Sequence, residues 1–233
     1  MISEDHVIWE KSVDGNLDKV TVNKNGYVSA IVTGTTYKSV IITYDEKGNE
    51  LFKTYLSKTI AVDACVSPDN AEFAYAEVNN SGTTIQSNIK IISIKDVKEK
   101  NTEPKYEYNA VQGSLILRIK YQDKSRLICM YDDSIHKFET GVDVELTKLN
   151  EDNPKITFAD IELSNYVFRT YEKSTSLFRA DTIIEMQNTS NGKENVYTIE
   201  EVAKSVVSNN NVIAVNLGNE VYFVETNADR KSV

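Results

Sequence analysis

The chain has 233 residues and carries 26 Lys plus Arg against 35 Asp plus Glu, a formal net charge of −9 at pH 7. This acidic balance argues against nucleic acid as a partner, because phosphate binding requires clustered Lys and Arg. Hydrophobic residues make up 40% and charged residues 26%, which is ordinary globular usage and excludes wholesale disorder. We expect one domain over residues 1–233.

Short runs of β-branched and aromatic residues follow one another along the chain, with Asn, Asp, Gly and Ser between them. Such runs favour strands, and such punctuation is typical of hairpin turns. No window shows sustained helical periodicity, so we predict an all-β chain with a helical turn or two at most. The predicted strands are 7–13, 19–23, 27–33, 39–44, 50–56, 60–66, 72–78, 88–94, 105–110, 114–121, 126–131, 135–139, 143–149, 155–163, 166–171, 176–186, 195–199, 202–207, 212–216 and 220–225.

A repeat underlies this order of strands. The tightest turns are centred near Asn25, Asp69, Asp123, Ser164 and Asn209, which are 44, 54, 41 and 45 residues apart. Four strands in each 40–50 residues is the spacing of a β-propeller blade. We therefore predict a β-propeller of about five four-stranded blades.

The count of strands leaves the last blade one strand short, because only 202–207, 212–216 and 220–225 belong to it. The run at 7–13 is left over at the other end of the chain. A ring of blades has unprotected sheet edges unless its termini meet, so we expect this N-terminal strand to complete the last blade beside 220–225. The alternative is a fragment of a larger propeller.

One turn carries a resemblance to a known group of propellers. The run Val66-Ser67-Pro68-Asp69-Asn70, followed by an alternating strand, resembles the Ser-Pro-Asp-Gly turn of bacterial WD40-like and TolB-like propellers. Asn70 stands where Gly is usual, and Asn is the best substitute at positive φ. The chain is similar to an uncharacterised group of Gram-positive propeller proteins, typically tethered by an upstream membrane helix. The resemblance implies a propeller of unknown function and supplies no catalytic residues.

The sequence shows no export or membrane segment. Residues 1–6 have neither a basic nor an apolar region of a signal peptide, and no run approaches the roughly 18 apolar residues of a membrane span. By this chain alone we expect a cytoplasmic protein; the alternative is an extracytoplasmic domain whose anchor lies upstream. Cys65 and Cys129 lie in apolar runs, and we expect both to be reduced and buried.

Signatures of common catalytic and metal sites are absent from the sequence. His6 and His136 have no ligand-spaced partner, and there is no Gly-x-Ser-x-Gly or glycine-rich phosphate loop. We therefore expect no metal, no cofactor and no catalytic residues. This favours a non-catalytic platform that binds a protein or a small ligand.

Four acidic residues are the candidate ligand-binding side chains. The first strand of each blade lines the central channel of a propeller, and Asp18, Asp63, Asp160 and Glu162 lie on predicted first strands or at their starts. Glycoside hydrolysis needs two carboxylates at a fixed separation. The alternative function is therefore a carbohydrate-active enzyme that uses channel carboxylates.

Overall fold

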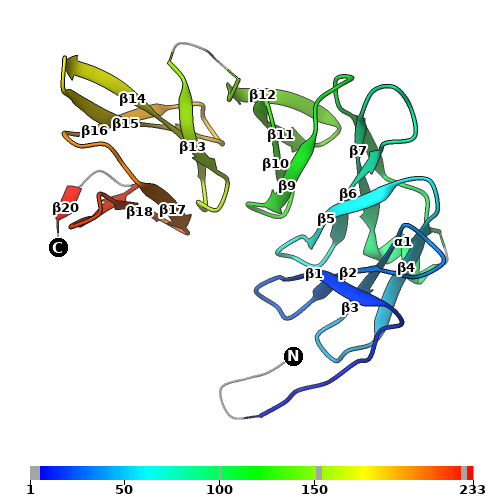
Figure 1. The fold of residues 1–233 in the computed structure, drawn as a ribbon. Helices are drawn as coiled ribbons and strands as arrows, with labels where there is room; N and C mark the ends of the chain where they lie inside the picture. The colour runs from blue at the N-terminus through cyan, green and yellow to red at the C-terminus, as the bar shows by residue number, and fades with distance from the viewer. Residues whose placement is uncertain (1–5, 100, 151–153, 227–229, 233) are drawn as a thin grey trace. The chain divides into compact units, whose positions relative to one another are not determined.

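The structure is a computed structural model that describes residues 6–99, 101–150, 154–226 and 230–232. Within these residues the chain forms the strands β1 to β20 and one short helix, α1 (Figure 1). The strands make five four-stranded sheets, each from four consecutive strands, which confirms the all-β prediction. The chain divides into two compact units: a first unit of Met1–Leu127 with Glu139–Asp143, and a second unit of Ile128–Phe138 with Val144–Val233.

The strands follow the predicted order closely. The first sheet holds β1 (Asn16–Val22), β2 (Val28–Thr33), β3 (Ser39–Tyr44) and β4 (Glu50–Leu56), and the second β5 (Ile60–Val66), β6 (Glu72–Asn79), β7 (Gln86–Ser93) and β8 (Tyr106–Asn109). The third holds β9 (Ile116–Tyr121), β10 (Arg126–Tyr131), β11 (Ser134–Glu139) and β12 (Val142–Lys148). The fourth holds β13 (Ile156–Asp160), β14 (Tyr166–Ser176), β15 (Arg179–Asn188) and β16 (Glu194–Ile199), and the fifth β17 (Ser205–Asn209), β18 (Val212–Asn216), β19 (Val221–Glu225) and β20 (Arg230–Ser232).

The helix α1 (Ile94–Lys98) directly follows β7. Ser93 is its N-cap, and the Ser93 side chain accepts a hydrogen bond from the Asp96 amide at 3.3 Å. Such a cap satisfies one of the amides that a helix start leaves unpaired. No helix in the described residues is long and apolar enough to cross a membrane.

Side-chain hydrogen bonds within the turn between β5 and β6 explain why residues 67–70 form a hairpin turn. The Ser67 hydroxyl donates to Asp69 Oδ1 at 2.7 Å and accepts from the amides of Ala71 and Glu72. Asn70 has a φ of 60°, as expected for the residue that replaces glycine. All five predicted turns lie between the first and second strands of a sheet.

The core of the first unit lies between the first and second sheets. All six residues of β3 and the first five of β2 are buried, because each of these strands has apolar neighbours on both faces. The rings of Phe52 and Phe73 meet at 4.5 Å between centroids. The buried cluster consists of Ile31, Ile41, Phe52, Leu56, Ala61, Ala64, Val66, Phe73, Tyr75, Ile92 and Ile94.

The second unit has two buried clusters. The larger joins the fourth and fifth sheets, with Phe168, Ile184 and Met186 packed against residues such as Ile213 and Val215. The smaller consists of Ile128, Ile135, Ile161 and Val167. Stacking the faces of successive sheets buries apolar surface that one sheet alone leaves exposed.

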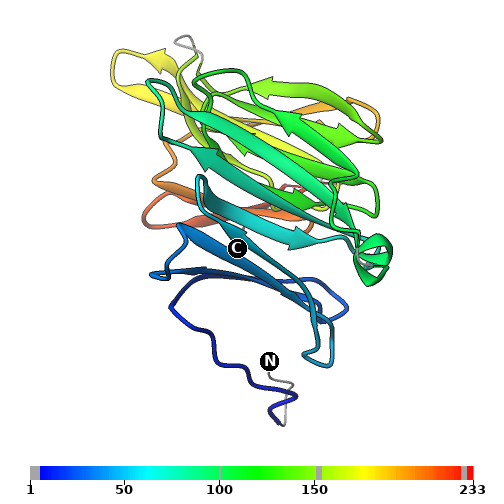
Figure 2. The ribbon, with the colours of Figure 1, turned by 90° about the vertical axis from the view of Figure 1, so that its right-hand side faces the viewer.

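The N-terminal segment does not form the strand that the sequence predicted at 7–13. Trp9 and Val13 instead pack against the buried face of the first sheet formed by Val28, Val32, Val40, Ile42 and Tyr44. The Trp9 indole donates to the Glu46 carbonyl at 3.2 Å, and its ring lies 5.6 Å from that of Tyr44. Residues 7–13, which we call the strap, therefore run beside the first sheet (Figure 2).

The fourth strand of the last sheet comes from the C-terminal end of the chain. β20 pairs with β19 through Tyr222, Phe223 and Val224, at the edge where the prediction had placed residues 7–13. The prediction was wrong at this point because a strand pairs at a sheet edge through backbone hydrogen bonds. The side-chain pattern of a sequence therefore does not identify which segment pairs there. The sequence Arg230-Lys231-Ser232 carries no apolar alternation that marks it as a strand.

Candidate functional site

Asp63 is the most buried of the four predicted ligand-binding residues, with 2% of its surface exposed. Its Oδ1 lies 2.9 Å from Lys19 Nζ and accepts the Ala64 amide at 2.9 Å. Its Oδ2 accepts the Ile119 amide at 2.9 Å. Lys19 lies on β1 and Ile119 on β9, so the carboxylate joins the first strands of three successive sheets.

Other polar contacts between the first two sheets also join residues that lie about one repeat apart. Asn23 Nδ2 donates to the Ser67 carbonyl, 44 residues further along, and to Asn70 Oδ1. Thr21 donates to the Ala64 carbonyl, 43 residues away. These separations match the repeat, because neighbouring sheets place equivalent positions of their first strands side by side. The polar residues at these positions hold the sheets together.

The remaining predicted site residues have different surroundings. Asp160, at the end of β13, accepts the Ile161 amide at 2.8 Å and the Ser208 hydroxyl at 2.8 Å, so it connects the fourth and fifth sheets. Glu162 is half-buried just beyond β13. Asp18 is exposed at a β-bulge in β1. Their assignment as ligand-binding residues stays a prediction.

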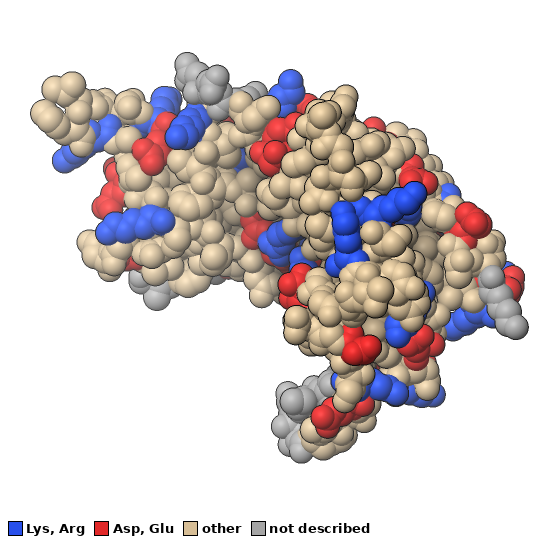
Figure 3. Space-filling model, turned by 45° about the vertical axis from the view of Figure 1, so that its right-hand side comes forward, with Lys and Arg blue, Asp and Glu red and all other residues tan. Residues whose placement is uncertain are grey.

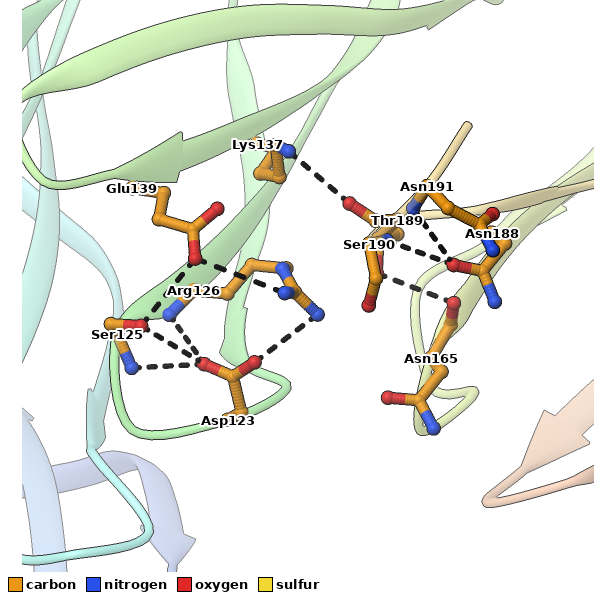
Figure 4. A network of polar contacts seen from close by, with 10 residues as sticks. All are labelled: Asp123, Ser125, Arg126, Lys137, Glu139, Asn165, Asn188, Thr189, Ser190 and Asn191. Carbon is orange, nitrogen blue, oxygen red and sulfur yellow. Dashed lines mark hydrogen bonds and ion pairs between the residues drawn. The ribbon is translucent and has the colours of Figure 1, made fainter. Parts of the chain in front are cut away.

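A polar cluster in the first unit is centred on Arg126, which is 9% exposed. Asp123 accepts the amides of Ser125 and Arg126 at 2.9 Å each and pairs with the Arg126 guanidinium at 3.1 Å (Figure 4). Glu139 lies 3.8 Å from the same guanidinium. These contacts hold the β9–β10 turn in shape.

A second polar cluster, in the second unit, is built around the β15–β16 turn. The Asn188 side chain accepts the amides of Ser190 and Asn191, and the Thr189 amide donates to the Asn165 carbonyl at 3.0 Å (Figure 4). Lys137 donates to the Thr189 carbonyl at 3.2 Å. Here too the polar groups satisfy the backbone of turns.

The two cysteines form no disulfide. Cys129 is fully buried, whereas Cys65 keeps some exposed surface as a residue. Burial raises the pKa of the Cys65 thiol, with a further contribution from the charge of Asp63. Among the described residues, no three His, Cys, Asp or Glu side chains lie close enough together to hold a metal ion.

A pocket of about 380 Å³ opens on the first sheet and on Asp14, just before β1. We call it the tyrosine pocket, because Tyr37 and Tyr55 form one wall with ring centroids 4.7 Å apart. These two residues are 40% and 50% exposed. The full lining is Asp14, Val32, Gly34, Thr35, Thr36, Tyr37, Val40, Ile42, Lys53 and Tyr55.

The local backbone holds the tyrosine wall in place. Gly34 has a φ of +74°, and a Cβ there would lie 2.7 Å from the Asn16 side chain. Thr35 accepts the Tyr37 amide at 3.0 Å and donates to the Tyr37 carbonyl at 3.2 Å. The β2–β3 turn is thus closed by its own side chains, which fixes the position of Tyr37.

Charged groups of both signs lie at the rim of the tyrosine pocket. The Lys53 ammonium lies 5.4 Å from the centroid of the Tyr55 ring. A hydrogen bond to the Tyr55 side chain raises the pKa of Lys53 above its ordinary value of 10.5, so the ammonium stays protonated. Asp14 is exposed at the same pocket. The pocket therefore offers aromatic faces, an apolar floor, an ammonium and a carboxylate to one ligand.

Sequence reasoning missed both the tyrosine pocket and the role of Lys19. The partnership of Lys19 with Asp63 was accessible, since the two residues are 44 apart, one repeat. The pocket was not, because it depends on how the β2–β3 turn and β4 bring Tyr37 and Tyr55 together. On the face shown in Figure 3, Lys and Arg side chains lie interspersed with Asp and Glu.

The sheets and their stacking define a β-propeller fold, and comparisons with known proteins agree. The chain belongs to DUF5711, a family of unknown function, whose sequence profile matches residues 1–231. No curated protein matches the sequence.

Solved structures with the same fold include domains of several enzymes. The β-propeller domain of the trilobed protease from Pyrococcus furiosus is 12% identical, with a TM-score of 0.59, and the match covers 94% of this chain and 72% of that one. Oligogalacturonate lyase from Vibrio parahaemolyticus is 8% identical, with a TM-score of 0.61, and the match covers 94% of this chain and 66% of that one. Prolyl oligopeptidase B from Galerina marginata is 16% identical, with a TM-score of 0.56, and the match covers 93% of this chain and 36% of that one. This chain therefore spans about a third of that enzyme. At these identities the likeness shows the fold alone.

Proposed function

We propose that the chain is a non-catalytic propeller that serves as a binding platform, and that the tyrosine pocket is its ligand site. One observation carries the proposal. Tyr37, Tyr55, Lys53 and Asp14 present aromatic, cationic and anionic groups to the same 380 Å³ space, and all four are exposed. Asp63 and Asp160, in contrast, are engaged in contacts between sheets.

The chemistry of the pocket favours a small polar ligand with one apolar face. A sugar ring or a short extended peptide has such a face to stack on a tyrosine ring, with hydroxyl or amide groups at its edge. Lys53 and Asp14 would then orient the ligand by hydrogen bonds from opposite charges. The partner is a small molecule or a segment of a protein.

The alternative function, a carbohydrate-active enzyme, has less support. A glycosidase needs a proton donor and a second carboxylate about 5–10 Å apart on either side of an accessible bond. Asp63 is 2% exposed, and both its oxygens are engaged by Lys19 and backbone amides. Proton donation from Asp63 would break these contacts.

Several finer assignments belong to the same proposal. The Ser67–Asn70 turn supports a relationship to WD40-like and TolB-like propellers, and the repeat supports one domain over residues 1–233. We keep as proposals a Gram-positive source and the absence of a nucleic-acid partner. Either a cytoplasmic location or an extracytoplasmic one behind an upstream anchor is compatible with the fold.

The test is a ligand screen by thermal unfolding, with uronic acid oligosaccharides and short extended peptides as probes. A ligand that binds the folded state raises the melting temperature. For a probe that does so, we expect Tyr55→Ala to weaken binding at least about tenfold and Tyr55→Phe to weaken it less, because the ring is retained. Lys53→Met should also weaken binding, because it removes the ammonium from the pocket. Its matched control is Lys58→Met, at an exposed lysine outside the pocket. Equal binding by Tyr55→Ala and wild type would overturn the assignment of the site.

A further inference from the structure

The hairpin of β14 and β15 ends in two exposed apolar residues. Its loop consists of Leu177 and Phe178, between the paired residues Ser176 and Arg179. Leu177 is 88% exposed and Phe178 is 91% exposed. Two-residue hairpin loops favour Asn-Gly or similar pairs, so turn formation does not explain this Leu-Phe loop. Large apolar side chains kept in water at such a position point to an interaction surface.

The loop lies at the end of a ribbon that extends past the rest of its sheet. β13 pairs with β14 only as far as Tyr171, and β16 pairs with β15 only from Thr182 onward. Residues 172–181, which we call the arm, therefore have no neighbouring strand within the described part of the sheet (Figure 1). At about 3.3 Å per residue, the arm extends about 16 Å beyond its last paired neighbours.

The base of the arm is firmly held. The Thr182 hydroxyl donates to the Glu201 carbonyl at 2.8 Å and accepts the Ala203 amide at 2.8 Å. Thr182 is 1% exposed. The arm thus projects from a fixed point, which keeps the exposed tip in a defined place.

The charge along the arm is arranged by distance from the tip. Between 174 and 180 the only charged residue is Arg179. The arm's carboxylates, Glu172 and Asp181, lie at its base, with Asp181 opposite Lys173. Glu200 and Glu201, which lie outside the arm, line a pocket of about 550 Å³ together with Phe178, Arg179 and Ala180. The arm's own tip residues are apolar with one positive charge.

The small size of the tip decides which kind of partner it fits. A stable protein interface buries about 800 Å² on each partner, whereas an aromatic side chain buries only about 150–250 Å². Leu177 and Phe178 together fall well short of that interface. A lipid surface has no such threshold, since it deforms around any inserted side chain and attracts basic residues through its phosphates.

We propose that the arm inserts Leu177 and Phe178 into the surface of a bilayer that contains anionic lipids, with Arg179 at the level of the phosphates. The length of the arm suits this role. The chain carries a net charge of −9, which an anionic surface repels. The screening length in physiological salt is about 8 Å, so an arm of about 16 Å holds most of that charge beyond the range of repulsion. This surface is separate from the tyrosine pocket and does not depend on it.

Tryptophan fluorescence gives a direct test, because Trp9 is the only tryptophan. The variant Phe178→Trp is mixed with phosphatidylcholine vesicles, with and without phosphatidylglycerol and with brominated lipids as quenchers. We expect a blue shift and quenching of the new tryptophan, while Trp9 in the wild type shows neither. Absence of the shift and of quenching would overturn the proposal.

A loop variant separates insertion from folding. Leu177→Asn with Phe178→Gly installs a favoured hairpin loop, so the hairpin stays folded. We expect vesicle cosedimentation to weaken at least about tenfold, since each lost apolar side chain is worth about tenfold or more. Val111→Asn, at an apolar residue that is 77% exposed elsewhere, is the control. Arg179→Gln should abolish the preference for phosphatidylglycerol. Unchanged binding by the loop variant, or self-association of the wild type that this variant removes, would assign the tip to another role.

Discussion

Asp63 shows how a residue that suggests chemistry can instead hold the fold together. It is buried, and its two oxygens contact Lys19, Ala64 and Ile119 on three strands. We expect Asp63→Ala to cost roughly 2–4 kcal/mol, because it leaves a buried amide without its acceptor and removes the partner of Lys19. Urea unfolding followed by Trp9 fluorescence measures this cost.

The control for Asp63 is another acidic residue of a first strand. Asp18 is exposed at a β-bulge, so Asp18→Ala should change the unfolding free energy by less than about 0.5 kcal/mol. Equal costs for the two variants would show that the contacts of Asp63 are not structurally important and would return it to the list of candidate site residues.

A second residue, Asp45, makes the stability of the first sheet depend on pH. Its carboxylate accepts the amides of Lys47 and Asn49 and the Asn49 side chain. Burial alone would raise the pKa of Asp45, but these hydrogen bonds, with the charge of Lys47, hold the pKa below its ordinary value of 3.8. The folded pKa is thus lower than the unfolded one, and the stabilisation is complete above the unfolded pKa and lost as the pH falls through the folded pKa.

The measurement for Asp45 compares two proteins at two pH values. Asp45→Ala should be less stable than the wild type at pH 6, and the difference should shrink once the pH falls below the ordinary pKa of 3.8, because the unfolded state then binds the proton more readily than the folded one. Trp9 is a suitable reporter because it donates to Glu46 in the same turn. A stability difference that stays constant between the two pH values would contradict the role of the ionised carboxylate.

At the scale of elements, the N-terminal strap is the feature that sequence reasoning placed wrongly. Strands and turns were predictable, because alternation and turn residues act locally. The strap has apolar residues in 7–13, but a pattern of this kind does not specify which surface they cover. Trp9 and Val13 pack on a face of the first sheet, and β20 pairs with β19 at the edge of the last sheet. The surface that the strap covers and the strand that pairs with β19 both depend on parts of the chain that are distant in sequence.

The strap should be energetically coupled to the β3–β4 turn. A Cβ on Gly48 would lie 3.0 Å from the Trp9 ring, and Gly48 has a φ of +81°. We expect Trp9→Ala to cost about 1–3 kcal/mol, below the value for a fully buried Trp, because Trp9 is only half-buried. Gly48→Ala should cost more in the wild type than in the Trp9→Ala variant, since only the wild type has the ring in the way.

A double-mutant cycle measured by circular dichroism gives this coupling, with Lys11→Ala on the same segment as the control. Lys11 is exposed, so its cycle with Gly48 should be additive. An additive cycle for Trp9 and Gly48 would mean that the strap does not rest on the first sheet.

At the scale of the whole molecule, the two compact units raise the question of whether they unfold together. The division between the units runs through β10, at Leu127 and Ile128, through β11, at Phe138 and Glu139, and through β12, at Asp143 and Val144. Neither unit therefore contains the third sheet complete. Loss of one unit would break strands that the other needs, so we predict a single cooperative transition for the chain.

Two probes, one in each unit, test this cooperativity. Trp9 fluorescence reports the first unit, and labelling of the buried Cys129 thiol in a Cys65→Ala background reports the second. We expect the two urea curves to have the same midpoint and slope, as two-state unfolding requires. If Cys129 becomes reactive at a urea concentration where the Trp9 signal is still native, the units unfold separately. The chain would then hold two folding domains, and the expectation of one domain over residues 1–233 would be wrong.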